Sequence, residues 1–228
     1  MCIIYRSQYI MPLQLPSQDI VEIGLDEVGR GCLFGDVVAA AVILPHTFPD
    51  DTWQQIKDSK KLSKKKREEL AMYIRQHAIA FAIGSASPEE IDHMNILQAT
   101  MCAMHRACDT LWEKYPLPEN GKLMVDGNYF KRYARVPHEL VKGGDNKVLS
   151  IAAASILAKT YRDQQIANLL QDHPEYDVYG LATNMGYGTK AHMSAISTHG
   201  LTPYHRRSFR CGGEKLKECQ DVDDSEKE

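Results

Sequence analysis

Two adjacent acids, Asp26 and Glu27, are the first residues whose surroundings suit chemistry, because an apolar stretch precedes them and Gly29-Arg30-Gly31 follows. Neighbouring side chains on a regular strand point to opposite faces, so both acids reach one site only if the chain bends there. The two glycines are expected to allow that bend. A solvated turn is the simpler interpretation of an isolated Asp-Glu pair, so the hypothesis depends on further acids at matching positions.

Two further acids have such positions. Asp126 follows a predicted strand over residues 122–125, at the sheet edge where ligands of open α/β folds gather. Asp145 follows Gly143-Gly144 and precedes a long predicted helix. Alone, Asp126 also suits a hairpin turn and Asp145 a helix cap. Together with the first pair, they predict a site that binds hard divalent cations through oxygen ligands.

Carboxylates gathered this closely repel one another unless cations neutralise them. Two divalent cations about 3.5–4 Å apart can activate a water and stabilise the leaving oxygen of a phosphodiester. The four acids therefore predict metal-dependent hydrolysis of nucleic acid.

Positive charge is concentrated in Lys57–Arg67, where seven of eleven residues are cationic. Three lysines, at 64–66, would occupy the first turn of a helix, where the macrodipole disfavours them. Phosphate binding explains that placement better than a solvated face does. Gly186-Tyr187-Gly188 predicts an exposed ring that can stack on a sugar or base, with a surface turn as the alternative. Further cations lie at Lys131, Arg132, Arg135, Arg206, Arg207 and Arg210.

The elements that must position these residues alternate between strand and helix. Strands are expected over 20–25, 37–44, 78–83, 122–125 and 140–141, and helices over 63–76, from Ser87 through Leu111 without a break, and over 148–170. This order predicts an α/β layer fold with a helical C-terminal appendage.

The 228 residues suit one large domain, expected over 19–212, with a flexible N-terminal extension over 1–18 and an acidic, disordered tail over 213–228. The net charge of −3 alone argues against a nucleic-acid protein, but residues 214–228 carry −4, which leaves about +1 for the rest. Six cysteines without a C-x-x-C pair argue against structural zinc or disulfides. No apolar run suits a membrane span or a signal peptide, which predicts a cytoplasmic protein without membrane contact.

In their order along the chain, these segments resemble the motifs of the ribonuclease HII family. The resemblance covers about residues 20–210 and rests on Gly24–Gly31, Asp58–Ser63, Val125-Asp126-Gly127, Gly144-Asp145, Ser150–Lys159, Gly186–Thr189 and His205–Phe209. Each motif is weak alone, and the ordered set is specific.

The resemblance implies a ribonuclease H-like fold, with a mixed sheet flanked by helices and a small helical C-terminal part. It implies hydrolysis of the RNA strand of RNA–DNA hybrids, and incision 5′ to ribonucleotides in duplex DNA that leaves a 3′-hydroxyl and a 5′-phosphate. A monomer is expected. The implied metal ligands, for two Mg²⁺ or Mn²⁺ ions, are Asp26, Glu27, Asp126 and Asp145; the implied substrate contacts are Gly29, Arg30 and Gly31 to the 2′-hydroxyl, Ser59 and Lys60 to phosphate, and Tyr187 to deoxyribose.

Some alternatives stay open at this point. Asp163, inside the long helix, competes with Asp145 as the fourth carboxylate, and the loop position favours Asp145. Asp36 departs from many relatives of the family and receives no metal role. Two other functions are a different nuclease, resolvase or transposase of the same superfamily fold, and a binding module that uses the basic segment alone.

Overall fold

The computed structural model describes residues 13–17, 19–134, 136–211 and 214–215. Its centre is a five-stranded sheet in the order β3-β2-β1-β4-β5. The bounds are β1 (Val21–Val28), β2 (Val37–Ile43), β3 (Ala80–Ala86), β4 (Gly121–Asp126) and β5 (His138–Val141). β1 pairs antiparallel with β2 and parallel with β4, which confirms the mixed sheet that was expected from the resemblance.

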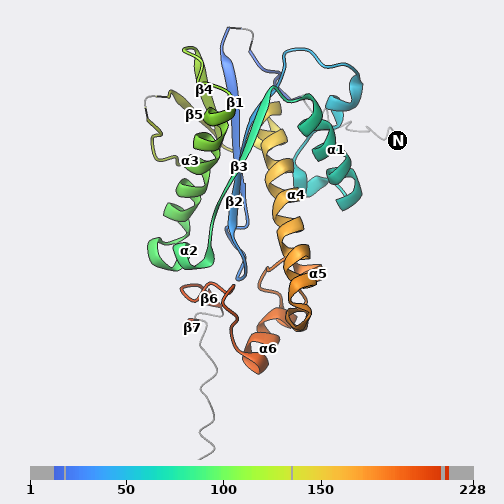
Figure 1. Ribbon diagram of the computed structural model, residues 1–228, viewed down its shortest axis with the longest axis vertical. Helices are drawn as coiled ribbons and strands as arrows, with labels where there is room; N and C mark the ends of the chain where they lie inside the picture. The colour runs from blue at the N-terminus through green and yellow to red at the C-terminus, as the bar shows by residue number, and fades with distance from the viewer. Residues whose placement is uncertain (1–12, 18, 135, 212–213, 216–228) are drawn as a thin grey trace, which may run out of the picture.

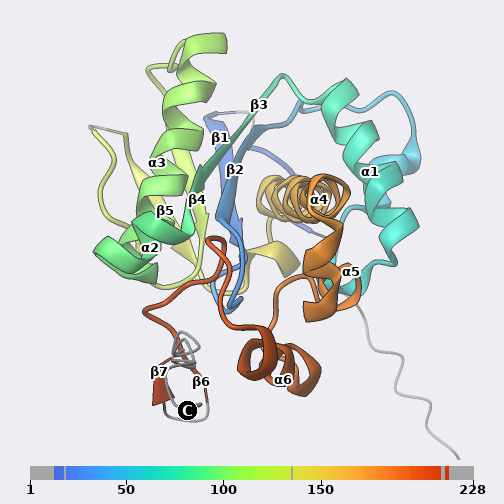
Figure 2. The ribbon, with the colours of Figure 1, turned by 60° about the horizontal axis from the view of Figure 1, so that its bottom comes forward.

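Helices cover both faces of this sheet (Figure 1). One face packs on α4 (Leu149–Asp172) with α1 (Lys64–His77) beside it, and the other packs on α3 (Ile96–Lys114) and α2 (Pro88–Met94). In Figure 2, α5 (Leu181–Asn184) and α6 (Lys190–His199) lie at the end of the sheet where β1 joins β2. Short elements are η1 (Asp51–Gln55), η2 (Ser59–Lys61), η3 (Gly144–Asn146), η4 (Pro174–Tyr179), β6 (Arg210–Cys211) and β7 (Glu214–Lys215).

β2 shows why helices can pack on both faces. All seven of its residues are buried, and successive side chains alternate between the two cores. Its three central residues are alanines, which keep both faces shallow and let helix backbones come close.

The helix α4 touches the backbone of β1 at Gly24. A Cβ built there would lie 2.1 Å from the carbonyl carbon of Ser150, so no larger residue fits without movement of the helix. Gly84 has the same relation to α3 on the opposite face, where a Cβ would lie 2.2 Å from the Ala103 carbonyl oxygen. These contacts fix both helices closely against the sheet.

The structure differs from the sequence-based expectation in several elements, among them β3, which covers Ala80–Ala86 where residues 78–83 were expected. The helix expected to run unbroken from Ser87 is two helices that meet at Asn95, whose φ of 72° interrupts the first. The Asn95 side chain accepts from the N–H groups of Leu97 and Gln98 and so caps the second helix. β1 also runs on to Val28, beyond the expected end at residue 25.

The ends of the chain are described only in part. Of the expected extension, residues 1–12 and 18 lie outside the described residues, while Gln14 pairs with Val148 beside α4. Of the expected acidic tail, residues 213 and 216–228 lie outside the described residues.

Candidate active site

Asp26 and Glu27 lie within β1, where they pair with Ala40 and Ala39 of β2. The bend comes after Val28, so the two acids keep the alternation of a regular strand. Asp26 is on the α4 face of the sheet, as Gly24 is, and Glu27 is on the α3 face. The expectation that the glycines bend the chain at the two acids is therefore wrong, because the bend begins after Val28; the charge of Asp126 nevertheless acts on both carboxylates.

Asp126 and Asp145 reach the same end of the sheet from the next strand and the following loop. β1 and β4 are parallel and in register at Leu25 and Val125, so Asp26 in β1 lies beside Asp126, the last residue of β4. The N–H of Gly144 donates to Asp126 Oδ1 at 2.7 Å, which joins this strand end to the loop that carries Asp145.

The electrostatics of these acids show how close they are. Burial raises the pKa of Asp26 well above its usual range, and the charges of Glu27 and Asp126 raise it further. Burial also raises the pKa of Glu27, where Arg30 opposes the shift and Asp126 adds to it. Burial is again the main cause that raises the pKa of Asp145. The site holds more negative charge than its own cations balance.

The donor chemistry suits a hard divalent cation, since carboxylate oxygens are the ligands that Mg²⁺ and Mn²⁺ prefer. A cation would also relieve the repulsion that raises these pKa values. Within the described residues, however, no three His, Cys, Asp or Glu side chains are already grouped as ligands of one ion.

Two cations interact with these acids: Arg30, whose Nη1 lies 3.4 Å from Glu27 Oε1, and Lys60. Burial alone would lower the pKa of its ammonium group, but the charges of Asp145, Asp26 and Asp58 outweigh that effect and raise it. Tyr187 interacts with Lys60 as well, and this residue is 42% exposed, as expected from the glycines beside it. Lys60 therefore lies between the acids and the exposed tyrosine.

Ser59 is placed differently from its neighbour. It is buried, and its hydroxyl lies 3.0 Å from the hydroxyl of Ser155 on α4. Ser155 in turn is a hydrogen-bond partner of the Asp26 carboxylate. The sequence interpretation missed Ser155, although it is one of the few polar residues in a helical stretch of small residues.

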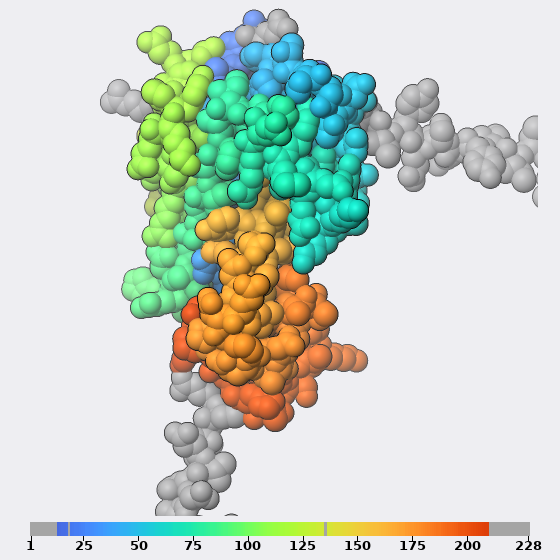
Figure 3. Space-filling view, turned by 45° about the vertical axis from the view of Figure 1, so that its right-hand side comes forward, coloured from blue at the N-terminus to red at the C-terminus, as the bar shows by residue number. Residues whose placement is uncertain are grey.

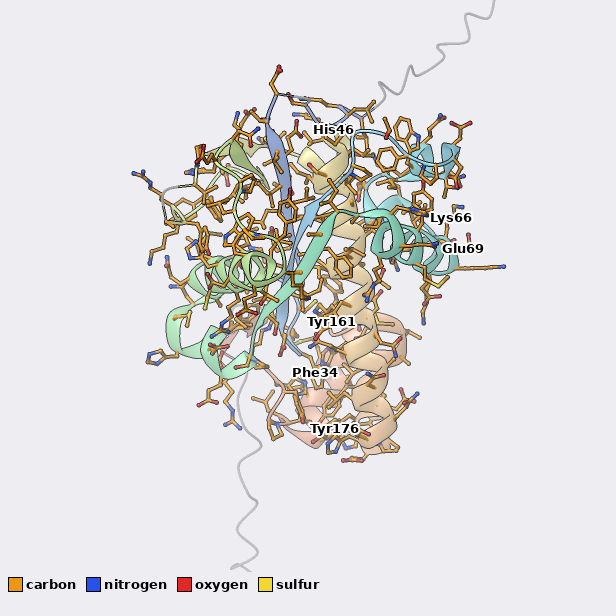
Figure 4. All side chains as sticks on the ribbon, turned by 45° about the horizontal axis from the view of Figure 1, so that its top comes forward. Phe34, His46, Lys66, Glu69, Tyr161 and Tyr176 are labelled. Atoms are coloured by element: carbon orange, nitrogen blue, oxygen red, sulfur yellow. The ribbon has the colours of Figure 1, made fainter. Side chains whose placement is uncertain are left out.

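The basic segment Lys57–Arg67 divides into exposed and engaged cations. Lys66 pairs with Glu69 at 3.4 Å on the outer side of α1, where Figure 4 labels both. Arg67 donates to the Ser59 carbonyl at 2.8 Å and is mostly buried. The exposed cations are Lys57, Lys60, Lys61, Lys64 and Lys65.

Asp163 belongs to a different group of charges. Its carboxylate pairs with Arg67 of α1 at 3.3 Å and with Lys159, one turn earlier in α4, at 2.6 Å. The pair with Arg67 ties α4 to α1 in the region where Figure 3 shows α4, in yellow and orange, beside α1.

A chain of hydrogen bonds through two buried histidines supports the Tyr187 loop. The N–H of Thr202 donates to His205 Nδ1 at 2.9 Å, so the neutral His205 ring carries its proton on Nε2. That Nε2 lies 3.1 Å from His192 Nε2, and His192 Nδ1 lies 2.9 Å from the Tyr187 carbonyl. These contacts are all satisfied only when both rings are neutral. A second proton on His205 would face the N–H of Thr202, and a second proton on His192 would face the N–H of His205.

This histidine pair predicts a loss of stability in mild acid. Burial, the neighbouring His192 and Arg207 lower the pKa of His205 to about 3, and burial lowers the pKa of His192. As the pH falls, the histidines of the unfolded chain take up protons before those of the folded chain. The stabilisation that the neutral pair gives the folded state is therefore complete above about pH 6.5, and it is lost as the pH falls from there toward 3. We expect the His205 contribution to fall by about 2 kcal/mol between pH 7.5 and pH 5.

Urea unfolding at both pH values measures this loss in the free energy of unfolding. The variant His205→Gln isolates the contribution, because the other titrating groups are unchanged. It should be less stable than the wild type at pH 7.5, and the difference should shrink at pH 5. An equal difference at both pH values would contradict the prediction.

Arg206, one of the further cations noted in the sequence, is fully buried. It does not add to the surface charge, because its guanidinium donates to backbone carbonyls inside the protein. Arg162 of α4 is buried in the same manner and was also missed. Their sequence signal was weak, since arginine is rarely buried without a carboxylate partner.

Comparison with known proteins agrees with the fold and shows the family. The profile of the family described as Ribonuclease HII matches residues 23–211. The chain belongs to the ribonuclease HII family. The ribonuclease HII of Bacteroides thetaiotaomicron is 50% identical over 204 residues, which cover 90% of this chain and 96% of that protein. Membership of the ribonuclease HII family makes this chain a ribonuclease H-type nuclease.

Solved structures show the same architecture. The ribonuclease HII of Archaeoglobus fulgidus, determined in complex with PCNA, aligns with a TM-score of 0.64 at 25% identity, over 86% of this chain and 98% of that one. A ribonuclease HIII, Bst-RNase HIII, determined in complex with Mn²⁺, aligns with a TM-score of 0.65 at 21% identity, over 82% of this chain and 64% of that one. Among the described residues of our chain, no helix has the length and apolar character that a bilayer crossing requires.

Proposed function

We propose that this ribonuclease HII hydrolyses the RNA strand of RNA–DNA hybrids and incises duplex DNA on the 5′ side of embedded ribonucleotides. The products would be a 3′-hydroxyl and a 5′-phosphate. The observation that carries the proposal is the convergence of Asp26, Asp126 and Asp145 at the sheet end where the Gly29–Gly31 turn begins, in a member of this family.

We assign Asp26, Glu27, Asp126 and Asp145 as the residues that hold two Mg²⁺ or Mn²⁺ ions. When bound, the ions would supply charge stabilisation and water activation for phosphodiester hydrolysis. The mutual repulsion of the acids supports this role, as does the Mn²⁺ bound by the structurally similar ribonuclease HIII. We prefer Asp145 to Asp163 because Asp163 already has two cationic partners, whereas Asp145 lies near Asp126.

The remaining residues would bind and orient the nucleic acid. Backbone groups of Gly29, Arg30 and Gly31 would contact the 2′-hydroxyl, the group that distinguishes RNA from DNA. Lys60 would hold a phosphate beside the acids, and the exposed ring of Tyr187 would pack on the neighbouring deoxyribose. The hydroxyl of Ser59 is already engaged with Ser155, so we assign its phosphate contact to the backbone.

Cleavage of two matched duplexes tests the proposal. One duplex carries a single ribonucleotide, the other is entirely DNA of the same sequence, and both are incubated with Mg²⁺ or Mn²⁺. We expect one cut, 5′ to the ribonucleotide, in the first duplex alone. Equal cutting of both would favour another nuclease of this fold, and salt-sensitive binding without metal-dependent cutting would favour a binding module.

We infer that the protein acts as a cytoplasmic monomer. The free thiols of Cys32, Cys102 and Cys108 agree with a reducing compartment. Light scattering of the purified protein tests the monomer directly.

A further inference from the structure

We propose that two buried arginines, Arg206 and Arg162, are positioning residues that hold the Gly29–Gly31 turn with its N–H groups facing the substrate. The inference rests on the proposed function, because it explains how this chain would present a rigid detector for the 2′-hydroxyl. Neither arginine would touch the nucleic acid.

The segment between β1 and β2, residues 29–36, lacks regular pairing of its own. It is enclosed between two C-terminal loops, through hydrogen bonds from Leu33 N to the Gly186 carbonyl at 2.8 Å and from Gly35 N to the Tyr204 carbonyl at 2.9 Å. Phe34 anchors it in the apolar cluster that includes Tyr176, and Figure 4 shows both rings at this end of the molecule. Its carbonyls still need donors, since they point into the protein.

Arg206 supplies donors to both ends of this segment. Its Nη1 donates to the Gly29 carbonyl at 2.7 Å and to the Arg30 carbonyl at 3.1 Å. Its Nε and Nη2 donate to the Gly35 carbonyl at 2.9 and 2.7 Å. One rigid guanidinium therefore fixes the beginning of the segment relative to its end.

Arg162 joins the segment to the Tyr187 loop. It donates to the Phe34 carbonyl at 2.7 Å, to the Asp36 carbonyl at 3.0 Å and, through Nη1, to the Met185 carbonyl at 2.8 Å. Because Met185 lies two residues before Tyr187, the same side chain relates the turn to the proposed deoxyribose contact.

Because the peptide bond is planar, a carbonyl whose direction is fixed also fixes the direction of the N–H group that follows it. In a trans peptide the carbonyl of one residue and the N–H of the next point in opposite directions. The carbonyls of Gly29 and Arg30 face the buried Arg206, so the N–H groups of Arg30 and Gly31 face the other way. Both residues are exposed, and neither N–H donates to another described residue. They are free to receive a ligand oxygen.

The glycines of the two loops make room for this arrangement. A Cβ at Gly29, whose φ is +92°, would lie 2.4 Å from Arg162 Nε. A Cβ at Gly186 would lie 3.3 Å from Arg162 Nη2 and 2.8 Å from the Phe34 carbonyl. Both glycines of the proposed substrate loops are thus required for the approach of one buried guanidinium.

Burial of two cations is unfavourable, which argues that they do more than fill space. Burial, together with repulsion from Arg162, lowers the pKa of Arg206 to about 10. Asp36 interacts with both guanidiniums and partly balances their charge. This gives a role to a residue to which the sequence assigned none. An apolar pair would pack here without that cost but would leave the carbonyls without donors.

The variant Arg206→Lys tests the inference, because lysine keeps the charge but cannot donate to both ends of the segment at once. We expect kcat/KM on the single-ribonucleotide duplex to fall by about 10- to 100-fold. The inhibition constant of an all-DNA competitor duplex, which engages the phosphate-binding surface alone, should stay within about two-fold. A matched control, Leu111→Ala, weakens the core far from the turn and should keep kcat/KM at a temperature where it is folded.

Each outcome decides between two statements. If the wild type cuts only the ribonucleotide duplex and Arg206→Lys does so with the same kcat/KM, the inference is overturned and the proposed function stands. An equal loss of kcat/KM in Leu111→Ala overturns the inference in the same way. A wild-type protein that cuts both duplexes equally overturns the proposed function, and the inference with it. If Arg206→Lys melts below the assay temperature, the same measurements on Arg162→Lys decide the question.

Discussion

Replacing Asp126 with asparagine should reduce cleavage of the ribonucleotide duplex by roughly 1000-fold or more, while the protein remains folded. Asparagine keeps an oxygen that can accept from the Gly144 N–H, so the contact between β4 and the Asp145 loop survives. What it removes is a charge that divalent cations would need, and metal ions supply several kcal/mol of transition-state stabilisation in such sites. Steady-state kinetics in Mg²⁺ or Mn²⁺ measures the loss.

The same substitution, which lowers activity, should not lower the stability of the protein when no metal is present. Asp126 raises the pKa of Asp26 by repulsion, so its removal should leave the melting temperature in EDTA equal or higher. The rise in melting temperature on adding Mn²⁺ should shrink. Asp172→Asn, at the exposed end of α4, is the matched control and should change neither activity nor metal response. Full activity of Asp126→Asn would remove this residue from the proposed metal site.

Replacing Gly24 with alanine should lower the free energy of unfolding by about 3 kcal/mol. The added Cβ would meet three backbone atoms of α4 at 2.1 to 2.6 Å, and backbone cannot move aside as a side chain can. The helix would have to move away from β1, which opens the core along its length. Denaturant unfolding followed by circular dichroism gives the value.

Gly31→Ala is the matched control for that measurement. A Cβ at Gly31 meets nothing within 4 Å, and its φ is not positive. The change should therefore stay within about 0.5 kcal/mol of the wild type. If both variants were equally stable, the close contact between β1 and α4 would be refuted.

The parts of the fold that could be predicted from sequence are those with strong local signals. β2 was visible as a continuous apolar run, and α1 and α4 were predicted as helices over residues 63–76 and 148–170. The break at Asn95 could not be predicted, because the helical pattern of apolar residues continues across this position. Only the left-handed backbone of Asn95 interrupts the helix.

The candidate site divides in the same way. Carboxylates at strand ends can be predicted from the sequence to lie close together, because parallel strands bring their carboxyl ends to one edge of the sheet. The face on which each acid lies depends on where the strand ends, and an error of three residues at Val28 changed the expected relation of Asp26 to Glu27. Arg206 could not be recognised as buried from sequence, because its partners are carbonyls almost the length of the chain away.

The helix α4 carries contacts of three different kinds on successive turns. Ser155 is a hydrogen-bond partner of Asp26. Asp163 pairs with Lys159 and with Arg67 of α1. Arg162 donates to carbonyls of the loops. Because the helix moves as one body, a shift that accommodates a change at one of these positions displaces the other two. Substitutions along α4 should then be strongly epistatic: a residue tolerated in one background would be harmful in another, although the side chains themselves never meet.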